Sequence, residues 1–317
     1  MNIAISISEN YIPYSYIMLT SLCENNRIEP LNVYILHGGI AANSLQAFNR
    51  LTNAYNCSIY FLEINKSVFG DKLPRTNEWT IEIYYRFTLP ELLPPEIDKI
   101  LYLDVDTIIL DDLSKLYHMD LKGKSVGACK DMGVLYGSGE LSEQQSALFS
   151  PLLKNKDYSY FNSGVLLMDI AKMRKEKRSV SFFVNVGEKI ADYIAGDQDI
   201  FNYVFHNDVV YADEEKYNIF GRTVYNMGRG YEWVKEHGVI VHFVGRKPWQ
   251  HEALRYNTEK LFWEYAKKTP YYTYLLESLL MKELESGFME TTFKNMEREN
   301  NEIRNLLTKC MNIMNQI

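Results

Sequence analysis

The sequence predicts an α/β protein built around a sheet that is covered by helices. Short β-rich runs, NIAISIS from residue 2, LNVYILHG from residue 31 and CSIYFLEI from residue 57, alternate with helical stretches at residues 13–24 and 42–55. This alternation indicates parallel strands. The chain has 317 residues, of which 46% are apolar, so it is long enough to bury a sizeable core.

Four further apolar runs extend the pattern. Residues 100–103 follow the turn signal Pro94-Pro95, and SVGACKD, FNSGVLLMDI and GVIVHFVG come later. Ligands of open α/β sheets bind beyond the carboxyl ends of the strands. The polar or small residues that follow these runs are therefore candidates for a site: Ser8, Asn10, Asp104, Asp106, Asp131, His242 and Gly245.

Charge and composition exclude several classes of protein. A net charge of -7 without a long basic block argues against a nucleic-acid surface. The four cysteines form no CxxC pair, which indicates a reducing compartment rather than a zinc site or a disulfide framework. We expect no signal peptide and no membrane-spanning segment. The segment SISENYIPYS contains no glycine, so the fingerprint of a nicotinamide dehydrogenase is absent after the first strand.

Two carboxylates, Asp104 and Asp106, follow the fourth apolar run in LDVDT. A buried charge is costly unless it is paired, so a positive group is expected beside them. If the chain stays extended, both side chains point to one side, with Val105 between them. Two carboxylates so placed can share Mg²⁺ or Mn²⁺, whose remaining ligands are often water and phosphate. In the alternative interpretation, one aspartate caps a turn and the other is solvated.

Three other segments contain candidate ligand-binding groups. In VIVHFVGRKPW, His242 ends a strand and Lys247 follows, so an imidazole and an ammonium could serve a metal and a phosphate. FNSG offers Asn162 beside small residues, and GDQD places Asp197, Gln198 and Asp199 at a predicted helix start. Each segment also has a purely structural interpretation, as a core histidine, a turn or a helix cap.

In this order, the motifs resemble the family 8 glycosyltransferases, a resemblance that covers roughly residues 2–265. It implies a GT-A fold, with a Rossmann-like, nucleotide-binding mixed sheet flanked by helices, and a retaining hexosyltransferase. The donor would be UDP-galactose or UDP-glucose, and the acceptor a glycan, a lipid-linked glycan or a protein. Mn²⁺ (or Mg²⁺) would lie beneath the diphosphate, and the family implies bacterial cell-surface glycan biosynthesis.

The resemblance also implies roles for individual residues. Asp104, Asp106 and His242 would bind the metal, and Lys247 the phosphates. Ser8, Asn10, Tyr11, Val105 and Gly245 would complete the nucleotide site, with Tyr11 stacked on uracil. Arg86, Asn162, Asp197 and Gln198 would hold the hexose hydroxyls. Ser8 departs from the family pattern, in which an acid is common, although a serine hydroxyl can also accept a hydrogen bond from uracil.

The mechanism implied by the resemblance involves Gln198, which matches the family's residue beneath the anomeric carbon. An amide is a poor nucleophile, which favours attack by the acceptor on the same face through a short-lived ion pair, with a diphosphate oxygen taking the proton. A covalent role for Asp199 stays open at this point. An alternative of another class is an inactive protein that binds UDP-sugars or glycans as a scaffold.

The C-terminal part, residues 266–317, is predicted to be a helical extension of the catalytic domain at residues 1–265. Apolar residues there recur four and three apart with one polar member, Asn300: Met289, Phe293, Met296, Ile303, Leu307, Cys310, Met314 and Ile317. The seam favours a homodimer through residues 289–317, or else a helix that lies on its own domain. We expect a cytoplasmic protein, with membrane contact limited to the periphery.

Overall fold

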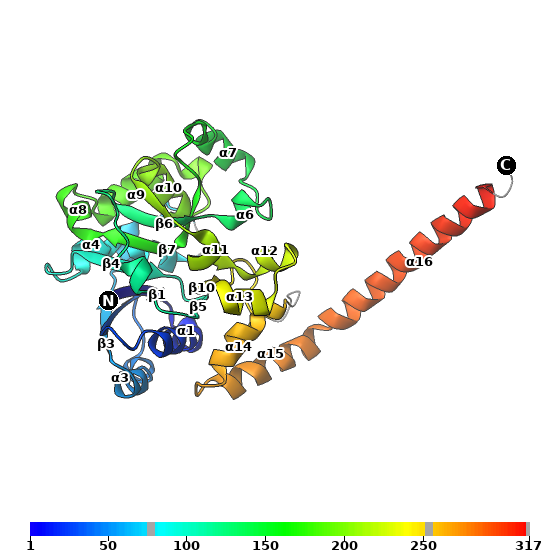
Figure 1. The fold of residues 1–317 in the computed structure, drawn as a ribbon, viewed down its shortest axis with the longest axis horizontal. Coiled ribbons are helices and arrows are strands. Elements are labelled where there is room, and N and C mark those ends of the chain that lie inside the picture. Colours follow the sequence, from blue (N-terminus) through cyan, green and yellow to red (C-terminus); the bar gives the residue numbers. More distant parts are fainter. Residues whose placement is uncertain (75–79, 251–255, 315–317) are drawn as a thin grey trace.

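The computed structural model describes residues 1–74, 80–250 and 256–314. Seven strands form the main sheet: β1 (Asn2–Ile7), β2 (Leu31–His37), β3 (Cys57–Glu63), β4 (Lys99–Leu103), β6 (Val126–Lys130), β7 (Phe161–Asp169) and β8 (Val209–Ala212). Their order is β3-β2-β1-β4-β7-β6-β8. Helices cover both faces of the sheet (Figure 1), which confirms the predicted α/β class.

The sheet is mixed rather than parallel throughout. β1, β2, β3 and β4 run parallel, as the alternation of strands and helices predicted. β7 is antiparallel to both of its neighbours, β4 and β6. Strand periodicity carries no information on direction, so the expectation of an all-parallel sheet is wrong for β7. The mixed sheet implied by the family resemblance is correct.

A second, three-stranded sheet lies beside the first and has the order β5-β10-β9. It consists of β5 (Thr107–Ile109), β9 (Ile219–Phe220) and β10 (Ile240–His242). β10 is antiparallel to β5, and the register pairs His242 with Thr107. This pairing brings the end of one distant segment against the residue that follows Asp106.

The helices of the first half match the predicted positions in part. α1 (Ile12–Asn25) begins with a proline in its first turn, where the missing N–H is harmless. The second predicted helix is divided into α2 (Ala42–Gln46) and α3 (Asn49–Ala54). The other short elements of this half are η1 (Glu9–Tyr11), η2 (Lys66–Phe69), η3 (Ile81–Thr88), α4 (Leu89–Leu92), α5 (Ser114–Tyr117), α6 (Met132–Leu135), α7 (Glu143–Phe149) and η4 (Leu152–Lys154).

The helices of the second half include the predicted helix at GDQD, which is α10 (Asp197–Phe205). The others are α8 (Ile170–Lys175), α9 (Val180–Lys189), η5 (Ala191–Tyr193), α11 (Glu214–Tyr217), α12 (Gly221–Asn226), α13 (Tyr231–His237), η6 (Asn257–Glu259), α14 (Lys260–Ala266), α15 (Tyr272–Ser286) and α16 (Phe288–Met314).

Apolar side chains pack on both faces of the main sheet. Ile3, Ile5 and Ile7 of β1 belong to the cluster that includes α1, while Ala4 belongs to the cluster on the opposite face, with α9 and α10. Such burial of both faces is typical of parallel strands. A third cluster lies under the small sheet and includes Leu275 of α15. The central strands are thereby fixed, and their carboxyl ends hold the polar residues in place.

The last helix, α16, extends away from the rest of the molecule (Figure 1). Its described apolar side chains are exposed, among them Phe293, Met296, Ile303 and Leu307. The alternative in which this helix lies on its own domain is therefore wrong for the described residues. Ile317 lies outside the described residues, as do the side chains of Met289, Cys310 and Met314.

Candidate functional site

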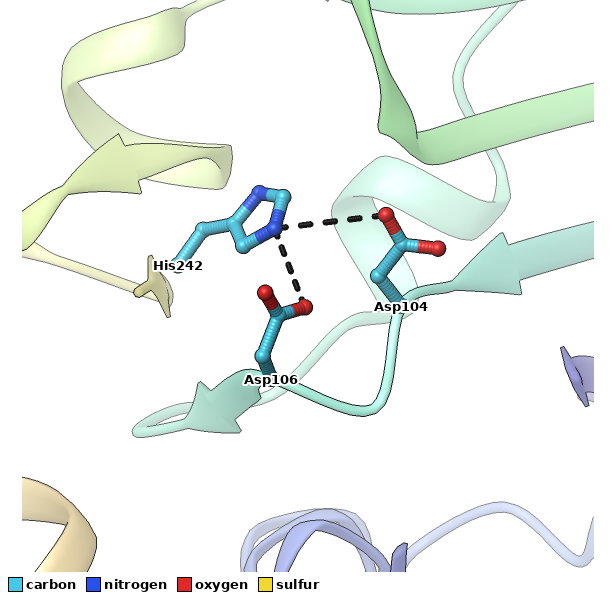
Figure 2. A group of neighbouring side chains, drawn as sticks. All are labelled: Asp104, Asp106 and His242. Atoms are coloured by element: carbon cyan, nitrogen blue, oxygen red, sulfur yellow. Dashed lines mark hydrogen bonds and ion pairs between the residues drawn. The ribbon is translucent and has the colours of Figure 1, made fainter. Parts of the chain in front are cut away.

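A turn between β4 and β5 presents the two aspartates. The Thr107 N–H donates to the Asp104 carbonyl at 3.3 Å, and the Thr107 hydroxyl donates to the same oxygen at 2.7 Å. The chain from Asp104 to Asp106 is therefore not extended, so the condition under which both side chains would point to one side is not met. The turn is closed by Thr107, whose N–H and hydroxyl both reach the Asp104 carbonyl, and this leaves the two carboxylates for other partners. The two carboxylates still converge, because the turn aims both at β10 (Figure 2).

Asp104, Asp106 and His242 form a group that could hold a metal ion. One ligand atom from each lies within 4.8 Å of the others. His242 Nε2 is 3.1 Å from Asp106 Oδ1 and 4.0 Å from Asp104 Oδ2. His242 and Asp106 are buried, whereas the Asp104 side chain is 28% exposed. Asp104 is thus the member of the group that is most accessible to solvent.

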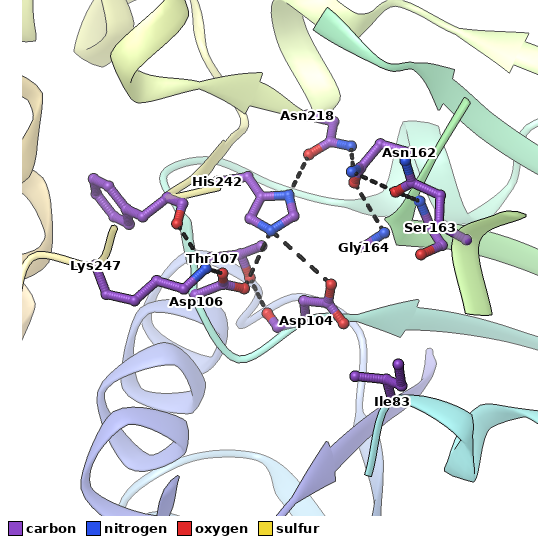
Figure 3. A network of polar contacts seen from close by, with 12 residues as sticks. Ile83, Asp104, Asp106, Thr107, Asn162, Ser163, Gly164, Asn218, His242 and Lys247 are labelled. Atoms are coloured by element: carbon purple, nitrogen blue, oxygen red, sulfur yellow. Dashed lines mark hydrogen bonds and ion pairs between the residues drawn. The ribbon is translucent and has the colours of Figure 1, made fainter. Parts of the chain in front are cut away.

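The carboxylate oxygen of each aspartate that faces away from His242 contacts a cationic side chain. Arg86 donates to Asp104 Oδ1 at 2.9 Å. The Lys247 ammonium contacts Asp106 Oδ2, as Figure 3 shows. Burial alone would raise the pKa of Asp106, but Lys247 and His242 outweigh it and hold this pKa well below its usual value. The positive groups expected beside the buried acids are therefore present.

The donor set suits a hard divalent cation. Two carboxylate oxygens and one imidazole nitrogen are ligands that Mn²⁺ and Mg²⁺ accept, and both ions commonly retain water or phosphate ligands. Asp104 Oδ2 and Asp106 Oδ1 face His242 rather than Arg86 or Lys247. These oxygens are the ones that a shared ion would contact.

A second polar group connects β7 with α10. The Gln198 carbonyl oxygen accepts from Asn162 Nδ2 at 2.8 Å and from the Ser163 N–H at 3.0 Å. The Gln198 amide donates to Asp131 Oδ2 at 3.1 Å. Asp197 accepts from the Ser163 hydroxyl at 3.2 Å, and it lies 3.2 Å from Arg86 Nε. Asn162, Asp197, Gln198 and Arg86 therefore lie together, as the motifs predicted.

Asp199 lies apart from the metal-binding group. Its carboxylate accepts hydrogen bonds from the Tyr160 hydroxyl at 2.5 Å, from the Ala195 N–H at 2.6 Å and from Gln145 at 2.9 and 3.0 Å. It is 1% exposed. These bonds join the start of α10 to α7 and to the chain before β7. These contacts support a structural role for Asp199, and its catalytic role stays a prediction.

The segment after β1 lies at the same edge of the sheet, because β1 and β4 are parallel neighbours. Ser8 precedes η1, which contains Asn10 and the half-buried Tyr11. The Tyr11 ring is 5.6 Å from Tyr14, which stacks on Trp249 at 4.0 Å.

Of the remaining predicted residues, Val105 is buried in the turn, and Gly245, with φ +80°, adopts a left-handed conformation that favours glycine.

A model of the family described as glycosyl transferase family 8 matches residues 2–253. The chain belongs to this family. General stress protein A of Bacillus subtilis is 26% identical over 268 residues, which are 78% of this chain and 87% of that protein. Lipopolysaccharide 1,2-glucosyltransferase of Escherichia coli K12 is 27% identical over 259 residues, 80% of this chain and 74% of the relative.

The fold of this family 8 member also resembles solved structures. The galactosyltransferase LgtC, in complex with donor and acceptor sugar analogs, superposes with a TM-score of 0.69 at 24% identity, over 85% of this chain and 96% of that one. This likeness and the mixed sheet confirm the predicted GT-A fold.

One residue of the family 8 site was missed by sequence analysis. Asn218, between α11 and β9, is fully buried, and its Oδ1 lies 2.9 Å from His242 Nδ1. Its sequence neighbourhood, KYNIF, carries no motif, and the two-residue strand after it is too short to show a period. Only the folded arrangement reveals this contact.

Proposed function

We propose that this family 8 glycosyltransferase is a retaining hexosyltransferase. It transfers glucose or galactose from a UDP-sugar to a glycan, a lipid-linked glycan or a protein, with Mn²⁺ or Mg²⁺ as cofactor. The proposal rests mainly on the arrangement of Asp104, Asp106 and His242, in which each acid keeps one oxygen for a cation. The relative that acts on lipopolysaccharide supports a cell-surface acceptor.

A divalent ion held by Asp104, Asp106 and His242 would supply Lewis-acid stabilisation for a leaving diphosphate. Lys247 is held by Asp106 and the Phe243 carbonyl, so its ammonium is preplaced for the phosphates. Ser8, Asn10 and Tyr11 bind the uridine. Arg86 fixes Asp197 and Asp104, and Asn162 fixes Gln198, which orients the hexose.

Retention is proposed to occur by attack of the acceptor on the same face as the leaving diphosphate. Gln198 has no acid to ionise, and its amide already bonds to Asp131 and Ser163. The Asp199 carboxylate is buried under hydrogen bonds from three residues, which argues against a covalent role. The acceptor proton passes to a diphosphate oxygen as the sugar–phosphate bond breaks and the new glycosidic bond forms.

The proposal is tested by measuring thermal stability and UDP release with UDP-, GDP- and ADP-sugars, with and without Mn²⁺. A UDP-hexose with Mn²⁺ should stabilise the protein by about 2.7 kcal/mol at a hundredfold excess over its dissociation constant. Asp106→Asn should remove this stabilisation and lower transfer on the order of 10²- to 10³-fold.

Asp111→Asn is the matched control, because Asp111 is an exposed acid just after β5. It should leave both measurements unchanged. Full transfer by the Asp106→Asn variant would contradict the proposal. Binding of UDP-hexose without transfer to any glycan, lipid-linked or protein acceptor would favour the scaffold alternative.

We further propose that the protein acts as a homodimer through residues 289–317, in the cytoplasm at the membrane periphery, where lipid-linked acceptors are made. No helix in the described part of the chain has the length and apolar character of a membrane span. The exposed seam of α16 supports the dimer, because Phe293, Met296, Ile303 and Leu307 gain no cover from their own chain.

A further inference from the structure

Asn218 connects the group of Asp104, Asp106 and His242 with the polar group on β7 and α10 through a buried chain of hydrogen bonds (Figure 3). On one side its Oδ1 lies 2.9 Å from His242 Nδ1. On the other side its Nδ2 donates to Asn162 Oδ1 at 2.9 Å, and Asn162 in turn donates to Gln198 at 2.8 Å. Asn218 is 0% exposed, so water cannot replace these bonds.

Two backbone N–H groups fix the direction of every bond in this chain. The Gly164 N–H donates to Asn162 Oδ1 at 2.9 Å, and the Ser163 N–H donates to Gln198 Oε1 at 3.0 Å. A backbone N–H can only donate, so Asn162 must present its oxygen towards Asn218 and its amino group towards Gln198. Asn218 must then present its amino group to Asn162 and its oxygen to His242.

This direction determines the tautomer of His242. An oxygen of Asn218 at Nδ1 requires a proton on Nδ1, so a neutral ring carries its lone pair on Nε2. That lone pair faces Asp106 Oδ1 at 3.1 Å and Asp104 Oδ2 at 4.0 Å. In the metal-free protein a second ring proton can lie between Nε2 and Asp106 Oδ1; without that proton, three electron-rich atoms so close together are favourable only around a cation.

We infer that Asn218 is a positioning residue that sets the metal-binding tautomer of His242 and couples the cation site to Asn162 and Gln198. The inference rests on the proposed function and adds a link between metal binding and the hold on the donor sugar. Residues that orient a metal-bound histidine typically change metal affinity 10- to 100-fold when they are replaced.

Two substitutions separate the contact of Asn218 with His242 from its contact with Asn162. Asn218→Ala removes both bonds, so Mn²⁺ affinity should fall about 10- to 100-fold and the KM for UDP-hexose should rise. Asn218→Asp retains an acceptor for the His242 N–H but cannot donate to Asn162. It should keep Mn²⁺ affinity at or above that of the wild type while the KM for the donor still rises.

Mn²⁺ affinity is measured on the protein without donor, from the electron paramagnetic resonance signal of free Mn²⁺. Asn26→Ala is the control, because Asn26 is equally buried and accepts from the Leu113 N–H at 2.8 Å. It should lower stability and leave Mn²⁺ affinity unchanged. Wild-type affinity in Asn218→Ala, or equal losses in both Asn218 variants, would overturn the inference.

The tautomer can also be read without any change at Asn218. In ¹⁵N-histidine spectra of the metal-free protein, the ring that disappears in His242→Gln should carry its proton on Nδ1. A proton on Nε2 alone would overturn the inference. If the wild type takes up no Mn²⁺, the proposed function fails as well; if it binds and transfers while Asn218→Ala binds equally, only the inference fails.

Discussion

Arg86 holds together acids from two distant segments. Its guanidinium is 2.9 Å from Asp104 and 3.2 Å from Asp197, donates to the Ser163 carbonyl at 2.5 Å and lies 4.0 Å above the Tyr102 ring. The planar fork of arginine can serve all these partners at once, whereas lysine could not. Burial of this cation is tolerated because two carboxylates surround it.

Replacement of Arg86 by Met should therefore be strongly destabilising. It would leave Asp104 and Asp197 without their cation, so the free energy of unfolding should fall by about 3–5 kcal/mol. Urea denaturation measures this loss. Lys72→Met serves as the control, because Lys72 forms an exposed pair with Glu188, and its loss should cost at most about 1 kcal/mol. Equal losses in the two variants would contradict the assigned role of Arg86.

Asp197 should make stability depend on pH. Burial raises the pKa of its carboxyl from 3.8 to about 6, although Arg86 opposes the shift. Between these values the folded form keeps a proton that the unfolded form has lost. The stabilising contribution of Asp197 is thus complete below pH 3.8 and is lost as pH rises through about 6, a change of about 3 kcal/mol.

Comparison of the wild type with Asp197→Asn isolates this effect. The difference in their free energies of unfolding, measured by urea denaturation from pH 4 to 7, should move against the wild type as pH rises. A difference that is flat, or that moves in favour of the wild type, would show that Arg86 outweighs burial at this carboxyl.

Within strand β7, Gly164 leaves the space in which the three proposed metal-binding side chains meet. A Cβ on this residue would lie 2.4 Å from His242 Cε1 and 2.7 Å from Asp104 Oδ2. Gly164→Ala should therefore displace two proposed ligands, and transfer should fall on the order of 10²-fold, with weaker Mn²⁺ binding. Gly139→Ala, whose Cβ would have its nearest neighbour at 3.5 Å, should leave both unchanged. Wild-type Mn²⁺ affinity in Gly164→Ala would contradict this account of the strand.

The apolar pattern of the sequence predicts the positions of the strands better than their directions. The runs that became β1, β2, β3 and β4 have a β-strand pattern that packing preserves on both faces. The turn from Asp104 to Asp106 was only one of two alternatives, because over so short a segment a strand end and a tight turn can have the same residues. The role of Asn218 was not predicted, because its partners, His242 and Asn162, are distant in sequence and come together only through β10 and β7.

At the scale of the whole molecule, α16 is the feature without a role in transfer. Phe293 is 62% exposed, Met296 54%, Ile303 54% and Leu307 59%, although they recur at coiled-coil spacing. Two parallel helices in register would cover them and place Asn300 against its copy, an arrangement that favours two strands. Glu299 of each helix would then lie beside Arg304 of the other, five residues further along.

This geometry predicts a dimer that is strengthened by two symmetry-related charge pairs between Glu299 and Arg304. The full chain should have twice its monomer mass in solution, and truncation after Gly287 should give a monomer. Glu299→Arg places like charges together and should weaken the dimer by about 1 kcal/mol, roughly fivefold in its dissociation constant. Adding Arg304→Glu should restore it, because each pair is attractive again with its sign reversed.

Arg298→Glu changes charge on the outer face of the same helix and should leave the dissociation constant unchanged. Analytical ultracentrifugation over a concentration series measures all five proteins: the full chain, the truncated chain and the three charge variants. Failure of the double variant to recover would exclude the parallel register, since antiparallel helices oppose other positions. A monomer that binds anionic lipid vesicles through α16 would exclude the dimer itself, because the lipid surface would then cover the seam that a second copy is proposed to cover.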